Sequence, residues 1–92
     1  MSKFKIKNTS LMILELLLSY AIQSGSFKVS FSKNDLFRSI TELDEKTLEL
    51  CLGYLFGSDL LVFINWLNSD KSNGVVQLTP KAVDWVESQD NH

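Results

Sequence analysis

The sequence contains few of the residue types on which catalysis and metal binding usually depend. Its single histidine is the C-terminal residue, His92, and its single cysteine is Cys51, so the chain has no cluster of these metal ligands. It also lacks a glycine-rich phosphate-binding loop and a recognisable nucleophile motif. We therefore expect a protein that is not an enzyme and that uses no cofactor or metal ion.

Features of a secreted or membrane-spanning protein are also missing. The longest apolar run, residues 11–18, contains a glutamate and is far shorter than the roughly 20 residues that a spanning helix needs. Lys3, Lys5 and Lys7 precede this run, as in a signal peptide, but no small-residue cleavage site follows. The lone Cys51 cannot form an intramolecular disulfide. These observations predict a cytoplasmic protein without a membrane partner.

An excess of positive charge is the third absence. The net charge is -2 and the isoelectric point is near 5.2, whereas dedicated nucleic-acid binders are usually basic. The densest basic segment, Lys3, Lys5 and Lys7, alternates with apolar residues and predicts a basic N-terminal arm or edge strand over residues 1–8. This arm either keeps the terminus soluble or contacts a DNA groove or an acidic partner.

The remaining length and its 45% hydrophobic content predict one domain over residues 9–88, followed by a polar tail over 89–92. A first helix, capped by Thr9 or Ser10, is predicted to continue until Gly25 supplies a left-handed stop. Its polar residues form one narrow stripe: Glu15, Ser19 and Gln23. Since the rest of its surface is apolar, we expect it to lie centrally or to form a homodimer interface between Leu11 and Ile22.

Next along the chain, residues 27–31 alternate in polarity and predict a strand. Ser32 and Asp35 resemble a capping box that opens a short second helix, and Asp44 is predicted to cap a third helix that ends at Gly57. The expected core face of the third helix consists of Leu48, Cys51, Leu52 and Leu55, widened by Leu50, Tyr54 and Phe56.

Residues 60–67 and 75–78 are rich in strand-forming side chains and flank a polar turn, so they predict a β-hairpin. Thr79 and Pro80 are suited to begin a last helix. In the first hairpin strand we expect Leu60, Val62, Ile64 and Trp66 to face the core, and Leu61, Phe63, Asn65 and Leu67 to face outward.

The predicted order of elements is helix, strand, helix, helix, strand, strand, helix. Leu48 to Leu61 resembles the recognition helix and first wing strand of winged helix-turn-helix proteins, and Val76 to Ala82 resembles their wing exit. This resemblance implies a mainly α, α+β fold in which the third helix enters a DNA major groove and the hairpin tip contacts phosphates or the minor groove. It further implies a dimeric regulator that binds double-stranded DNA.

A DNA-binding regulator is therefore the predicted function, although the charge of the third helix departs from that of a typical DNA binder and supports an alternative. Four carboxylates, those of Glu42, Asp44, Glu45 and Glu49, lie where phosphates would approach, and they oppose DNA binding. The alternative is a winged-helix interaction module that uses acidic and apolar surfaces to bind or inhibit a protein partner of a nucleic-acid machine. Under either hypothesis the candidate contact residues are Lys3, Lys5, Lys7, Lys33, Arg38, Glu45, Lys46, Glu49, Lys71 and Asn73.

Overall fold

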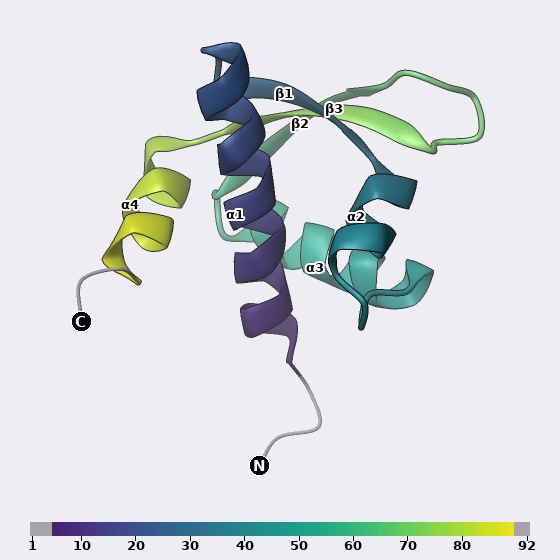
Figure 1. Ribbon diagram of the computed structural model, residues 1–92, viewed down its shortest axis with the longest axis horizontal. Coiled ribbons are helices and arrows are strands. Elements are labelled where there is room, and N and C mark those ends of the chain that lie inside the picture. Colours follow the sequence, from purple (N-terminus) through teal and green to yellow (C-terminus); the bar gives the residue numbers. More distant parts are fainter. Residues whose placement is uncertain (1–4, 90–92) are drawn as a thin grey trace.

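Residues 5–89 of a computed structural model form helices and one three-stranded antiparallel sheet (Figure 1). The described elements are α1 (Ile6–Ser24), β1 (Lys28–Ser32), α2 (Lys33–Ser39), α3 (Glu45–Gly57), β2 (Leu61–Trp66), β3 (Asn73–Leu78) and α4 (Pro80–Ser88). The expectation of a small, mainly helical α+β fold is confirmed.

Helix α1 begins one turn earlier than the sequence predicted. It starts at Ile6, so an arm or edge strand is wrong for residues 6–8, and residues 1–4, with Lys3, lie outside the described residues. Thr9 and Ser10 do not cap the helix, because both are buried inside it. The cause is tertiary packing: Ile6 lies on the same helical face as the buried residues that follow, and it packs against the core.

The apolar surface of α1 is mostly covered within this chain. Ile13, Leu14 and Leu17 are fully buried, and Figure 1 shows α1 in the middle, between α4 on one side and α2 and α3 on the other. Gly25 ends the helix with a φ of 74°, as predicted. The interior of a single chain therefore accounts for most of the apolar surface that led us to expect a dimer.

The two middle helices begin in different ways. Ser32 occupies the N-cap of α2, yet within residues 5–89 its side chain accepts no capping hydrogen bond, and Asp35 pairs with Arg38. The predicted capping box is therefore wrong. Asp44 caps α3 as predicted by accepting a hydrogen bond from the Thr47 N–H at 2.8 Å. Helix α3 ends at Gly57, as predicted, but this glycine is itself helical. The left-handed residue that follows the helix is Asp59, with a φ of 63°.

The strand order in the sheet is β1-β3-β2, and the β2–β3 hairpin projects past α2 (Figure 1). The predicted facing of β2 is wrong at its start, where Leu61 is buried and Val62 is exposed. Ile64 is an extra residue opposite β3, since Phe63 pairs with Val76 and Asn65 pairs with Val75. This bulge breaks the strict alternation, so Ile64, which we expected to face the core, is exposed. Phe63 is exposed and Trp66 is partly buried, as predicted.

Glycine is required at one point of the sheet. Gly74 in β3 lies opposite Phe31 of β1 and Trp66 of β2, and a Cβ at this position would lie 3.0 Å from both rings. The rings of Phe31 and Trp66 therefore meet edge to face across the glycine, with their centroids 6.1 Å apart. This contact fixes the hairpin against the rest of the sheet.

Candidate macromolecular interface

A groove of about 500 Å³ separates α3 from the β2–β3 hairpin, and the N-terminus of α2 closes one side. We call it the α3–hairpin groove. Apolar side chains from α3 and β2 line it, and charged side chains of both signs surround them. The lining residues are Lys33, Glu45, Leu48, Glu49, Leu52, Gly53, Phe56, Trp66, Asp70 and Lys71.

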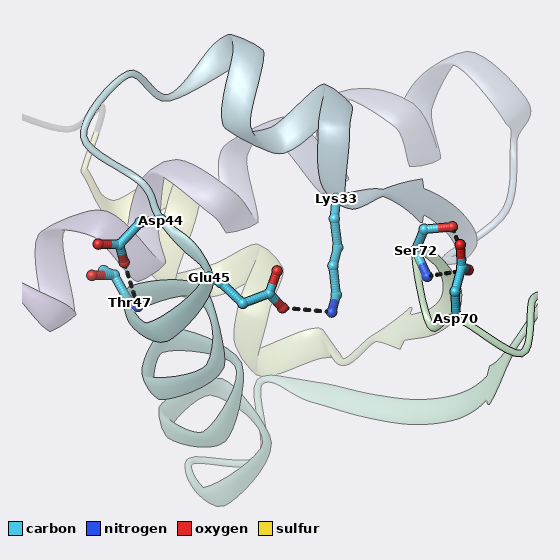
Figure 2. Close-up of polar contacts among 6 residues, drawn as sticks. All are labelled: Lys33, Asp44, Glu45, Thr47, Asp70 and Ser72. Atoms are coloured by element: carbon cyan, nitrogen blue, oxygen red, sulfur yellow. Dashed lines mark hydrogen bonds and ion pairs between the residues drawn. The ribbon is translucent and has the colours of Figure 1, made fainter.

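Lys33 connects the elements around this groove. Its Nζ lies 2.8 Å from Glu45 Oε2, an ion pair that is drawn in Figure 2. The same Nζ lies 5.2 Å from the centroid of the Trp66 ring. Its backbone N–H donates to the Ser72 carbonyl at 2.9 Å. The Lys33 side chain is only 17% exposed. Its charge is therefore compensated by Glu45 and largely withdrawn from solvent, which makes it a poor contact for a phosphate.

The hairpin turn next to Lys33 is held by its own polar groups. Asp70 Oδ1 accepts hydrogen bonds from the Ser72 backbone N–H at 3.1 Å and from Ser72 Oγ at 2.8 Å (Figure 2). These bonds favour the carboxylate and hold the pKa of Asp70 below its ordinary value. Lys71 between them adopts a φ of 60°, so the turn places one carboxylate and one ammonium group at the edge of the groove.

The outward face of α3 is acidic and apolar together. Glu45, Lys46 and Glu49 are exposed, as predicted. Leu50 and Tyr54, predicted to widen the core face, are instead exposed, and Leu50 keeps 62% of its surface in contact with solvent. The reason is geometric, since α3 packs against α1 and β2, and these neighbours leave the side chains on its far side uncovered.

The other predicted contact residues are dispersed. Lys5 lies 3.8 Å from Glu42, and Lys7 is an exposed residue of the first turn of α1. Arg38 at the end of α2 pairs with Asp35 at 2.7 Å. Asn73 lines a separate recess beside β1. Of the candidate residues, the structure thus brings together Lys33, Glu45, Glu49 and Lys71 in the groove.

Several groove residues were missed by sequence reasoning. Asp70 was regarded as part of a polar turn, and Trp66 and Phe56 as ordinary core residues, although each of them lines the groove. No local sequence pattern marks these residues, because they come together only when α3 and the hairpin pack in the folded chain. Trp66 does contact its neighbours, with its ring centroid 5.3 Å from that of Phe63, but it stays partly exposed.

Two further findings limit the kinds of site in residues 5–89. Within this range, no three histidine, cysteine, aspartate or glutamate side chains lie together in a way that could hold a metal ion. None of the described helices is both long and apolar enough to cross a membrane.

Comparison of the chain with protein-family models, with curated proteins and with solved structures finds no match. The case for a function therefore depends on the fold and the interface geometry alone.

Proposed function

We propose that this chain is a winged helix-turn-helix domain that binds a protein partner through the outward face of α3, without catalysing a reaction. The element order and the β1-β3-β2 strand order support the fold assignment. In such a fold α3 occupies the position of the recognition helix and the β2–β3 hairpin that of the wing. The buried free thiol of Cys51 is consistent with a reducing compartment such as the cytoplasm.

The exposed Leu50 on an acidic helix is the observation that carries this proposal. Leu50 and Tyr54 are large and uncovered, and they lie on the same helix as the exposed carboxylates of Glu45 and Glu49. Large apolar side chains that are exposed on a charged helix are typical of protein interaction sites. A phosphate backbone would gain little from Leu50 and would be repelled by Glu49. A protein surface with an apolar pocket and basic residues complements both features.

A DNA-binding regulator is the second candidate, and one observation favours it. Within the described residues, Lys46 of α3 and Lys71 of the hairpin lie beyond ion-pair distance of any carboxylate, so both remain available to phosphates. Such regulators bind as symmetric dimers, and the exposed Met12 and Ile22 of α1 would be the residues on which a dimer through that helix depends.

A peptide selection distinguishes the two candidates. We would select a phage-displayed library of random peptides on the immobilised chain and measure each recovered peptide by fluorescence anisotropy. We expect peptides that combine aliphatic or aromatic residues with arginine or lysine. Leu50→Gln should weaken their binding by about five-fold or more, as for an interface anchor. Ile22→Gln removes an exposed apolar side chain on α1, and it serves as the matched control that should leave binding unchanged.

The same proteins are then titrated with a DNA duplex of mixed sequence at low salt. Equal peptide binding by wild type and Leu50→Gln contradicts the protein-interaction proposal. DNA binding that is weakened by Lys46→Gln and by Lys71→Asn, but not by Leu50→Gln, establishes the regulator instead.

A further inference from the structure

The α3–hairpin groove is large enough to hold two neighbouring side chains of a partner. Its volume of about 500 Å³ is within the range of ligand pockets. Leu52 and Phe56 of α3 and Trp66 of β2 give it apolar and aromatic walls. Gly53 adds open space, because no heavy atom lies within 4 Å of the position that a Cβ there would occupy. An inserted side chain would therefore find apolar contact without having to displace a residue.

The charges around the groove favour a cation. Lys33 and Glu45 neutralise each other at 2.8 Å. Of the remaining charged lining residues, Glu49 and Asp70 are negative and Lys71 is positive, which leaves one net negative charge. The hydrogen bonds given to Asp70 by Ser72 both end on Oδ1, and Oδ2 is left to accept from a ligand. Trp66 already has the Lys33 ammonium 5.2 Å from its ring centre, so an incoming cation is drawn to the carboxylates of Glu49 and Asp70 rather than to that ring.

We infer that the α3–hairpin groove binds an arginine side chain of the protein partner, with an adjacent leucine-like side chain of that partner against the apolar wall. Arginine fits better than lysine because its planar guanidinium group can pack against the apolar and aromatic walls and presents several N–H groups to the carboxylates at the groove. This inference rests on the proposed function, and it adds a second contact beside the exposed Leu50, because Leu50 is not among the residues that line the groove.

Acetyl-leucyl-arginine amide is the probe for this site. Its binding can be followed by NMR through the indole N–H of Trp66, while the Trp85 indole in α4 serves as an internal reference. We expect saturable shifts at Trp66 at millimolar probe concentration. The citrulline analogue has the same shape without the charge, and it should bind about two- to five-fold more weakly. Equal affinity for the two probes, or an unmoved Trp66 signal, overturns the inference.

Variants of the groove give effects of opposite sign. Glu49→Gln should lower the affinity for the arginine probe about two- to five-fold, and Lys71→Asn should raise that affinity by a similar factor. Asparagine is chosen because it tolerates the left-handed backbone at residue 71. Gly53→Leu should fill the groove and abolish binding, whereas Gly53→Ala should preserve it. Glu87→Gln on α4 is the charge control and should have no effect. Binding that withstands Gly53→Leu places the probe elsewhere and contradicts the inference.

Failure of this inference can be distinguished from failure of the proposed function. If library peptides depend on Leu50 but the arginine probe does not bind the groove, the proposed function stands and the groove assignment falls. If the probe binds the groove but no selected peptide depends on Leu50, the proposed use of the α3 face falls instead.

Discussion

Helices α1 and α3 have similar leucine-rich sequences and both contribute to the core, yet α3 leaves more of its apolar surface exposed. Helix α1 contacts α3, α4 and β1, so Ile13, Leu14 and Leu17 are fully buried. Helix α3 contacts α1 and β2, and its far side leaves Leu50 and Tyr54 in solvent. The neighbours of a helix, rather than its leucine content, decide how much of its apolar surface is buried.

The two helices also differ in how their polar groups are hydrogen-bonded. The buried Ser10 hydroxyl of α1 makes no hydrogen bond of ordinary geometry among residues 5–89. It lies by the Cys51 thiol, whose pKa is raised by burial and lowered to a smaller extent by this hydroxyl. The polar groups at the start of α3 are satisfied, because Asp44 caps the helix and Glu45 pairs with Lys33. The α1 region is therefore stabilised by packing, and the α3 and hairpin region is positioned by specific polar and aromatic contacts.

The largest expected effect comes from replacing one leucine in each helix by alanine and comparing the two losses of stability. Leu14→Ala leaves a cavity in the core and should lower the free energy of unfolding by about 2–5 kcal/mol. Leu50→Ala should change it by no more than about 0.5 kcal/mol, since this side chain is already in water. Urea denaturation followed by circular dichroism measures both values. Similar losses for the two variants would show that α3 buries its outer face in the free chain.

A smaller loss is expected when the hairpin contact is disturbed. The Cβ of Gly74→Ala would press on the rings of Phe31 and Trp66, so we expect a loss of about 1–3 kcal/mol. Gly57→Ala is the matched control, because open space surrounds that position and alanine favours helix. The same denaturation experiment compares the two variants. A neutral Gly74→Ala would mean that the aromatic contact does not fix the hairpin.

Removing the unpaired hydroxyl of α1 should stabilise the protein. Ser10→Ala deletes a buried group that loses its water on folding and also raises helix propensity, so we expect a gain of about 0.5–1.5 kcal/mol. Ser19→Ala changes helix propensity alike but removes a hydrogen bond to the Leu16 carbonyl, so its gain should be smaller. Thermal unfolding of both variants tests the difference. A destabilised Ser10→Ala would reveal that the hydroxyl has a partner in solution.

The smallest expected effect is a pH dependence on the α3 side. The hydrogen bond from the Thr47 N–H holds the pKa of Asp44 below its ordinary 3.8. A lowered pKa in the folded state contributes stability above the ordinary value, and that contribution is lost as the pH falls through the lowered value. Asp44→Asn keeps the cap without titrating, so thermal unfolding from neutral to strongly acidic pH should show a smaller decline than wild type.

Asp70 provides a second titrating group on the same side of the molecule, since its pKa is also lowered. Asp70→Asn should reduce the acid-induced decline separately from Asp44→Asn. An unchanged acid profile in the Asp44→Asn, Asp70→Asn double variant would assign the decline to other carboxylates.

Local sequence signals predicted the parts of the fold that depend on a residue and its immediate neighbours. Gly25 at the end of α1, Asp44 and Thr79 as N-caps and the buried face of α3 were all found in this way. Each follows from the conformational freedom of glycine, the hydrogen bonds of a capping side chain or the period of a helix. These causes act within a few residues of the chain, so the sequence alone determines them.

Tertiary structure determined the features that these local signals could not predict. Packing of Ile6 on the core extended α1 through a segment whose alternation suggested a strand. The bulge at Ile64 interrupted the alternation of β2, and the packing of α2, α3 and the hairpin placed Lys33 against Glu45 and placed Asp70 beside the groove. Each outcome depends on contacts between residues far apart in sequence. Only the folded chain determines which side chains these contacts bury and which charges they bring into pairs.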